Sequence, residues 1–288
     1  MPPAGADFSG YVIERTLGRG GSATVYLARR PGDPIPVALK VLHPEHRTDE
    51  DRHRLQRGFT LSAQLDHPHI ITEYEHGPDW VTMRYVDGGN ITALRAPPAR
   101  LTALAQIADA LDHAHRLGIV HCDVKPPNIL VHQDFSQGGA VLIDFGVAHV
   151  LAEDMAVRLA RADGHRLSLN PAQRITRQPA PPEPTVHASL PYAAPELLLG
   201  QMPSGDTDQY SLACTAVELF TGAPPFAAET AAGLVEAHVH QRPPRFSGRK
   251  AGLPRSFDSV VAVALAKEPD ARYESCTQLV ELLDQALG

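Results

Sequence analysis

The chain has 288 residues, 43% of them hydrophobic and 20% charged, so it can bury a sizeable core as one large domain or as two lobes around a cleft. Its formal net charge of −7 argues against a nucleic-acid-binding role driven by overall charge. No apolar run approaches the roughly 18 residues that cross a bilayer, the first ten residues lack a signal-peptide pattern, and the three cysteines lack metal-ligand spacing. These features predict a cytoplasmic protein with no nucleic-acid partner and no membrane span within this chain.

Strand patterns dominate the first third of the chain. Apolar segments bounded by turn residues predict strands over residues 11–13, 25–28, 37–42, 70–75 and 81–86. A polar helix is expected from about Thr48 to Gln64, because acidic residues suit its first turn and a His-Pro pair follows its end.

Helical patterns dominate the rest of the chain. A strand is expected over residues 141–143, and apolar residues at helical spacing predict helices over residues 101–117, 207–221, 228–240, 256–267 and 276–287. Residues 151–188 are weakly patterned and turn proline-rich from Pro171 to Pro184, which is typical of a functional lid or a disordered segment. Strands first and helices later predict an α+β fold, with a small β-rich lobe on a larger, mainly helical lobe.

A glycine-rich turn joins the first two strands and consists of Leu17, Gly18, Arg19, Gly20, Gly21, Ser22, Ala23, Thr24 and Val25. Glycine lets backbone N–H groups approach a phosphate without a Cβ in the way, although such a turn by itself is more often only a tight hairpin. Lys40 follows at the end of the next apolar strand. The pairing of this turn with this lysine predicts a site for nucleotide phosphates.

The strongest signal is the stretch of residues 121–130, which is followed by a D-F-G sequence that begins at Asp144. Its polar side chains suit phosphoryl transfer. The carboxylate of Asp123 could orient a hydroxyl and take its proton, and the ammonium of Lys125 could neutralise charge on the moving group. Asn128 and Asp144 offer oxygen ligands for a divalent metal.

Together these motifs resemble the protein kinase family, in particular bacterial Ser/Thr kinases of eukaryotic type, over about residues 11–286. Further matches lie at residues 192–196 (Y-A-A-P-E), 208–212, 218–226 and 267–273. The resemblance implies the two-lobe protein-kinase-like fold as a single protein kinase domain over residues 1–288. It places the N-lobe at about 8–86, the hinge at about 83–90, the C-lobe at about 91–287 and a long activation segment at 144–196.

The resemblance also implies roles for the matching residues. Asp123 would be the catalytic base and Lys125 a contact of the γ-phosphate. Asn128 and Asp144 would hold Mg²⁺ or Mn²⁺. ATP would bind against the glycine-rich turn (Leu17 to Val25) and against Ala38, Lys40, Met83, Arg84, Val86 and Leu130, with Val25, Ala38 and Leu130 around the adenine. Ser189 and Lys125 favour Ser or Thr over Tyr as the acceptor, and Arg272 would pair with Glu196.

One departure from the family pattern is Gly58, which stands where the helix glutamate that partners Lys40 is expected. No Glu occurs between Glu50 and Glu73, so a small shift of register does not supply one. Either a carboxylate from elsewhere serves Lys40, or catalysis is weak or absent.

A second departure is Cys122, which replaces the arginine that would grip a phosphorylated activation loop. The segment still holds candidate acceptors, namely Ser168, Thr176, Thr185 and Ser189. We hypothesise that phosphorylation of this segment is not the main activating switch.

We expect an ATP- and Mg²⁺-dependent Ser/Thr protein kinase that phosphorylates itself and proteins bearing Ser or Thr. The alternative is a pseudokinase, a nucleotide-binding scaffold with weak or no phosphotransfer because of Gly58. A small-molecule phosphotransferase is a third hypothesis, against which the A-P-E sequence and Arg272 argue. A homodimer, and an origin as the cytosolic part of a longer membrane-anchored protein, are left open.

Overall fold

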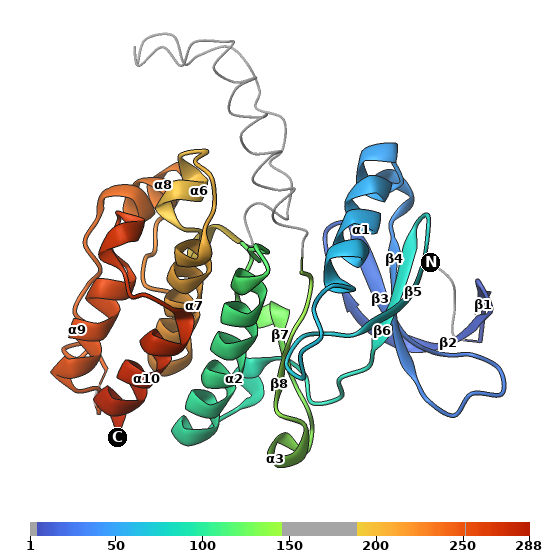
Figure 1. The fold of residues 1–288 in the computed structure, drawn as a ribbon, viewed down its shortest axis with the longest axis horizontal. Helices are drawn as coiled ribbons and strands as arrows, with labels where there is room; N and C mark the ends of the chain where they lie inside the picture. Colours follow the sequence, from blue (N-terminus) through green and yellow to red (C-terminus); the bar gives the residue numbers. More distant parts are fainter. Residues whose placement is uncertain (1–4, 146–188, 251) are drawn as a thin grey trace, which may run out of the picture.

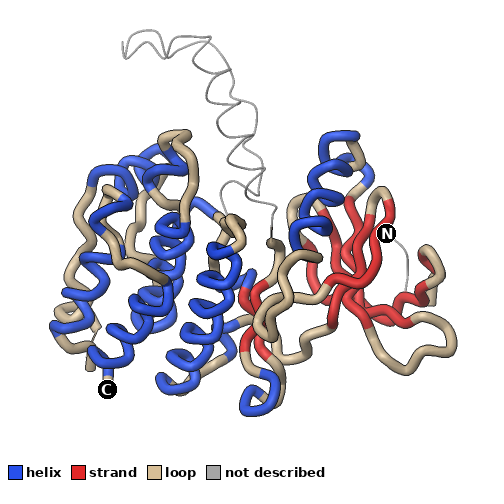
Figure 2. The backbone as a smooth tube through the Cα atoms, in the orientation of Figure 1, coloured by secondary structure: helices blue, strands red, loops and turns tan. Residues whose placement is uncertain are grey.

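The computed structural model describes residues 5–145, 189–250 and 252–288. Strands gather at one end of the molecule and helices at the other, with a small two-stranded element between them (Figures 1 and 2). This arrangement confirms the predicted α+β fold with a β-rich lobe and a larger helical lobe. Within the described residues, no helix is long and apolar enough to cross a membrane.

The smaller lobe is built on a six-stranded antiparallel sheet with the strand order β1-β2-β3-β4-β6-β5. Its strands are β1 (Asp7–Phe8), β2 (Tyr11–Arg19), β3 (Ala23–Arg29), β4 (Val37–Leu42), β5 (Glu73–Gly77) and β6 (Trp80–Arg84). Every residue of β4 except Lys40 is buried, because both faces of the sheet are covered. One face packs around Tyr11 and Leu39, and the other, called the inner face below, packs around Ala38 and Met83 toward the second lobe.

Helix α1 (Asp49–Ser62) packs against β5 and β6 (Figure 1). The hydroxyl of Thr48 accepts a hydrogen bond from the N–H of Asp51, and acidic residues in the first turn suit the positive end of the helix dipole. Leu55 and Phe59 of α1 belong to the apolar cluster of the inner face. The helix therefore closes one side of the space between the lobes.

The second lobe is helical, and α7 (Gly205–Thr221) forms its centre. Thirteen of the 17 residues of α7 are buried, as expected for a helix surrounded by other elements. A capping box at Ser204 begins it, and Gly222 ends it in the left-handed conformation. The other helices of this lobe are α2 (Pro97–Arg116), α6 (Pro195–Leu198), α8 (Ala231–His240), α9 (Arg255–Ala264) and α10 (Cys276–Leu287), while the short α3 (Phe135–Gly138) connects β7 to β8.

A short hairpin of β7 (Ile129–Val131) and β8 (Ala140–Leu142) lies at the junction of the two lobes (Figure 1). The N–H of Ile71 donates to the carbonyl of Leu142 at 2.9 Å, and the N–H of Leu142 donates to the carbonyl of His69 at 2.8 Å. These bonds tie the segment before β5 to the hairpin. The chain that leaves β8 is thereby brought beneath the inner face of the sheet.

Several element boundaries differ from the prediction. Strand β5 begins at Glu73, because Ile70 instead forms a bridge to Leu142, and β6 ends at Arg84, two residues before the predicted end. Helix α2 begins at Pro97, four residues early, since proline is well tolerated in a first helical turn.

Other differences concern short elements and helix ends. Strands β1 and β7 and helix α3 have two to four residues each, too few to produce a periodic pattern, and were not predicted. Helix α8 begins at Ala231, after its cap Thr230, and α9 ends at Ala264. The proline-rich segment, Gly146 and the candidate acceptors Ser168, Thr176 and Thr185 lie outside the described residues.

Candidate active site

The glycine-rich turn folds as the tip of the β2–β3 hairpin. The N–H of Gly20 donates to the carbonyl of Ala23 at 2.9 Å. His43 supports the tip from the side, with one ring nitrogen 2.9 Å from Thr24 Oγ1 and the other 3.1 Å from Gly21 O. The side chain of Thr24 is therefore engaged within the protein, whereas the glycines at the tip are exposed. Backbone groups of the tip are the ones that can meet a phosphate.

Lys40 on β4 and Asp144 after β8 meet between the lobes. Nζ of Lys40 lies 2.5 Å from Oδ1 of Asp144, and both side chains are mostly buried. Burial lowers the pKa of Lys40, but the Asp144 carboxylate, together with Glu73 and Asp123, outweighs burial and raises this pKa above its ordinary value. Burial likewise raises the pKa of Asp144, and the ammonium of Lys40 outweighs it and lowers this pKa. Both groups are therefore charged at neutral pH, and the junction contains an ion pair.

An apolar cluster lies on the inner face beside this ion pair. It brings together six residues of the predicted nucleotide site, which are Leu17, Val25, Ala38, Met83, Val86 and Leu130. They come from β2, β3, β4, β6, the segment directly after β6, and β7. The N–H of Arg84 donates to the carbonyl of Thr72 at 2.9 Å, so it is not available to a nucleotide. The cluster can receive a flat apolar ring between the lobes.

Asp123, Lys125 and Asn128 converge in the loop before β7. Nζ of Lys125 lies 2.8 Å from Oδ2 of Asp123 and donates to Oγ of Ser189 at 2.7 Å. The amide nitrogen of Asn128 donates to the backbone carbonyl of Asp123 at 2.8 Å and to its carboxylate at 2.9 Å. The Asp123 carboxylate is thus held in one orientation, and the hydroxyl of Ser189 contacts the same Lys125 ammonium. Such an arrangement can accept the proton of a bound hydroxyl.

Asp208, in the first turn of α7, anchors the backbone of this loop. Its fully buried carboxylate accepts hydrogen bonds from the N–H of His121 at 2.8 Å and from the N–H of Cys122 at 2.6 Å. The backbone at Cys122 has a φ of 59°, which a residue other than glycine adopts only when its surroundings hold it. Asp208 supplies that support and so aims Asp123. Sequence reasoning missed this role, because an Asp in a first helical turn looks like an ordinary capping residue.

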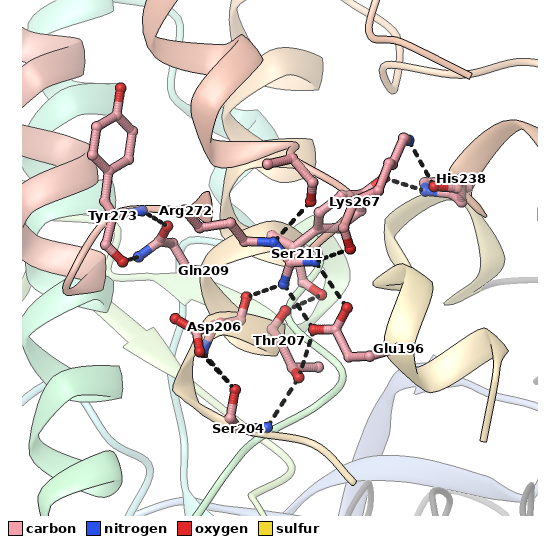
Figure 3. Close-up of polar contacts among 12 residues, drawn as sticks. Glu196, Ser204, Asp206, Thr207, Gln209, Ser211, His238, Lys267, Arg272 and Tyr273 are labelled. Atoms are coloured by element: carbon pink, nitrogen blue, oxygen red, sulfur yellow. Dashed lines mark hydrogen bonds and ion pairs between the residues drawn. The ribbon is translucent and has the colours of Figure 1, made fainter. Parts of the chain in front are cut away.

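Glu196 and Arg272 form the predicted ion pair. Nη1 and Nη2 of Arg272 lie 2.7 and 2.8 Å from Oε1 and Oε2 of Glu196, and both side chains are buried. Figure 3 shows the guanidinium directed at the Glu196 carboxylate, which also accepts from Oγ1 of Thr207 at 2.9 Å. The pair connects α6 to α7 and to the loop before α10. This prediction is confirmed.

Asn128 and Asp144 carry the oxygen atoms expected to bind a metal. The amide nitrogen of Asn128 is engaged by Asp123, so the amide oxygen is the atom that can face a cation. One carboxylate oxygen of Asp144 contacts Lys40, which leaves the second one for a ligand. Amide and carboxylate oxygens are suited to Mg²⁺, which binds proteins through a few such atoms together with substrate phosphates. The donor set therefore fits a divalent metal bound with a nucleotide.

Gly58 is a buried residue of α1, the helix in which a glutamate partner of Lys40 is expected. A Cβ added at Gly58 would meet the carbonyl oxygen of Phe145 at 3.5 Å, so this point of α1 faces the residue after Asp144. Sequence reasoning missed a carboxylate nearby, that of Glu73 at the start of β5. Burial raises the pKa of Glu73 to about 7, while the charge of Lys40 lowers it and that of Asp144 raises it. The sequence contained a signal for the position of Glu73. Residues two apart in a strand share a face, so the apolar Ile71 indicates that Glu73 lies on the buried face.

Comparison with known proteins agrees with this fold and site. The model of the protein kinase domain matches residues 11–282. The Ser/Thr protein kinase PknJ of Mycobacterium tuberculosis is 39% identical over 99% of the chain and 46% of its own length. The Ser/Thr protein kinase PknF of the same species is 36% identical over the whole chain and 59% of its own length. The chain thus spans about half the length of these curated relatives.

A solved structure is similar over nearly its full length. The crystal structure of the M. tuberculosis PknI kinase domain has a TM-score of 0.70 and 32% identity, and the match covers 99% of both chains. The fold and the site define a two-lobe kinase. The chain belongs to the protein kinase family and, within it, to the bacterial Ser/Thr kinases of eukaryotic type. The names of these relatives do not support the pseudokinase alternative.

Proposed function

We propose that this domain transfers the γ-phosphoryl group of ATP to Ser or Thr hydroxyls of proteins, itself included. The observation that carries the proposal is the convergence of Asp123, Lys125 and Asn128 in one loop, beside the Lys40–Asp144 ion pair. Family membership and the names of the relatives support the same chemistry. The single domain is proposed to comprise residues 1–288, with the lobe and segment boundaries given above.

Asp123 is the proposed base. Its carboxylate accepts from Asn128 and contacts Lys125, so it is fixed in direction and can take the proton as the acceptor oxygen attacks. The ammonium of Lys125 would then offset the negative charge that develops on the transferred group. Ser189, 2.7 Å from Lys125, stands beside the place of the acceptor and supports a preference for Ser and Thr.

ATP is proposed to bind with its base in the apolar cluster and its phosphates between the tip of the β2–β3 hairpin and Lys40. Asn128 and Asp144 would hold the Mg²⁺ or Mn²⁺ ion. The ion, when bound, neutralises phosphate charge and makes the γ-phosphorus more open to attack. A kinase that depends on ATP acts where ATP is supplied, so a cytoplasmic location is part of the proposal. A homodimer stays a prediction.

The test is phosphate transfer from labelled ATP in Mg²⁺ or Mn²⁺, to the chain itself and to a general protein substrate. Asp123→Asn and Lys40→Met should each lower transfer at least about 100-fold, because one removes the base and the other the phosphate contact. Lys250→Met, an exposed lysine in the other lobe, is the matched control and should keep wild-type activity. Absence of transfer by the wild-type chain, or transfer by Asp123→Asn at the wild-type rate, would overturn the proposal.

A further inference from the structure

Lys40 receives no carboxylate from α1, although α1 is correctly placed to offer one. The Cβ that Gly58 lacks would lie 3.5 Å from the carbonyl of Phe145, the residue that follows Asp144. A distance of this size is an ordinary contact, so a Cβ fits at this position, beside the residue that follows Asp144. The missing glutamate is therefore a property of residue 58 and does not come from a displaced helix.

The sheet register places Glu73 on the same face as Lys40. Glu73 is opposite Met83 on β6, and Met83 is opposite Ala38 on β4. Residues directly opposite each other share a face, as do residues two apart in a strand, so Ala38 and Lys40 lie on one face as well. Met83 and Ala38 belong to the inner-face cluster, which places Glu73 there too.

Glu73 has a carboxyl group in which one oxygen is buried and lacks a hydrogen-bond partner within the described part of the chain. Its Oε2 atom is buried and accepts no hydrogen bond from the residues that the structure describes. Burial has the largest effect on the pKa of Lys40 and lowers it, Asp144 raises it, and the charge of Glu73 raises it further. Lys40 in turn lowers the pKa of Glu73. A buried carboxylate without a partner is costly, and the nearby ammonium is the group that can compensate for it.

We propose that Glu73 is the positioning residue for Lys40, and that it does from β5 what a glutamate at position 58 of α1 would do. In the structure Lys40 contacts Asp144 directly. If Asp144 ligated a metal ion, Glu73 would be the carboxylate left to hold the ammonium toward the phosphates. Because β5 belongs to the same sheet as β4, this orientation of Lys40 does not depend on the position of α1. The inference rests on the proposed function.

The test compares Glu73→Gln with wild type by two measurements. The first is the dissociation constant of a non-hydrolysable ATP analogue with Mg²⁺, measured by calorimetry. The second is the kinetics of protein phosphorylation. We expect the analogue to bind at least about threefold more weakly and kcat/KM for ATP to fall at least about tenfold. KM for the protein substrate should stay at the wild-type value, and the melting temperature without nucleotide should stay equal or rise, because a costly buried charge is removed; a packing role would predict a fall.

Two further variants make the outcome specific. Glu75→Gln lies on the same strand, where Glu75 contacts Tyr11 and Arg30 instead, and it should match wild type. Gly58→Glu should restore kcat/KM when it is combined with Glu73→Gln, because it returns a carboxylate to the helix. Wild-type binding and kinetics of Glu73→Gln would overturn the inference. So would a failure of Gly58→Glu to rescue, provided that Gly58→Glu alone is active.

Failure of the proposed function has a different signature. If the wild-type chain transfers no phosphate but binds the analogue, the kinase proposal fails, while the binding comparison of wild type with Glu73→Gln still decides the role of Glu73. Equal binding by the two would then overturn the inference, and weaker binding by Glu73→Gln would support it.

Discussion

Arg272 and Glu196 are charged residues with almost no exposure, at 0% and 3% of their side-chain surface. Two parallel hydrogen bonds join them, and the guanidinium also donates to the backbone carbonyls of Asp206 and Ala266. This set of partners compensates for the loss of water around both charges. Removing one member leaves the other buried and uncompensated.

We therefore expect Arg272→Met to lower the free energy of unfolding by about 3–5 kcal/mol, measured by urea denaturation. Glu14→Gln is the control, because Glu14 pairs with Arg29 at the surface, where each side chain is more than a third exposed. The control should change stability by less than about 1 kcal/mol. Equal effects of the two substitutions would contradict the expected difference between a buried and an exposed pair.

Cys122 is a second residue whose charge is decided by its surroundings. Burial raises the pKa of its thiol far above the ordinary value, and the charges of Asp208 and Asp123 raise it further, so the side chain is neutral. A neutral thiol does not bind a phosphate group as an arginine would. Position 122 therefore offers no charged anchor for a phosphorylated activation segment.

The expected consequence is weak dependence of activity on phosphorylation. A phosphatase-treated sample and an autophosphorylated sample should differ in kcat/KM by less than about threefold, because no new charge-assisted contact forms at position 122. Mass spectrometry should confirm the phosphorylation state of each sample. A gain of more than about tenfold on autophosphorylation would refute the hypothesis.

At the scale of elements, α8 is joined to α7 through a buried histidine. Nδ1 of His238 lies 3.0 Å from the hydroxyl of Tyr210, and the side chain of His238 has no exposed surface. Lys267 donates to the carbonyl of the same residue at 2.6 Å (Figure 3). Burial, with the charge of Lys267, lowers the pKa of His238 to about 4. The ring is therefore neutral in the folded protein.

Acid should weaken this contact. Since the pKa of His238 is about 4 in the folded state and about 6.5 in the unfolded state, the unfolded state binds the extra proton between these values. The contribution of the neutral His238 to stability is complete above about pH 6.5 and is lost as the pH falls toward 4. At pH 4.5 the loss from His238 should be about 2–3 kcal/mol.

The measurement is urea denaturation of wild type, His238→Gln and His240→Gln at pH 7.5 and pH 4.5. The stability difference between wild type and His238→Gln should shrink or reverse at the lower pH, because the variant has no ring to protonate. His240 lies on the same helix but is exposed, so the stability difference between wild type and His240→Gln should be the same at both pH values. A pH-independent difference for His238→Gln would contradict the assignment.

Elements with a long periodic pattern follow the sequence closely. Helix α10 has the predicted limits, and α7 begins only two residues before the predicted start. Both have strong end signals, a serine cap at the start of each and a glycine after the end of each. The boundaries of β5 and β7 were not predictable, because pairing with other segments sets where such short strands begin and end.

At the scale of the whole molecule, the residues proposed to bind the nucleotide come from both lobes. Lys40 and the β2–β3 hairpin belong to the sheet, whereas Asn128 and Asp144 belong to the hairpin and loop at the junction. A ligand that contacts both sides binds the folded chain and not the unfolded one. Its binding free energy therefore adds to stability.

We expect a non-hydrolysable ATP analogue with Mg²⁺ to raise the melting temperature. At 100 times its dissociation constant it adds about 2.7 kcal/mol of stability. For a chain of this length that corresponds to a shift of several degrees, at about 2–4 °C per kcal/mol. Replacing Mg²⁺ by EDTA should remove most of the shift, because the phosphates then repel Asp144. An equal shift in EDTA would refute the proposed metal-binding role of Asn128 and Asp144.

The sequence by itself determined the class of fold and the order of the longer elements, and it predicted a set of residues for the candidate site. These depend on short-range information, namely hydrophobic periodicity, caps, glycines and the spacing of polar residues in one stretch. Asp123, Lys125 and Asn128 lie within six residues, so their convergence was predictable. The pairing of Arg272 with Glu196 was predictable only through the family resemblance.

Only the tertiary structure decided which carboxylates support the site. Glu73 reaches the surroundings of Lys40 because β6 lies between β4 and β5, and the register of three strands puts both on one face. Asp208 holds His121 and Cys122 because α7 packs against the loop that contains them. Contacts of this kind join residues far apart in the chain, and a one-residue change of register would reverse the face on which Glu73 lies.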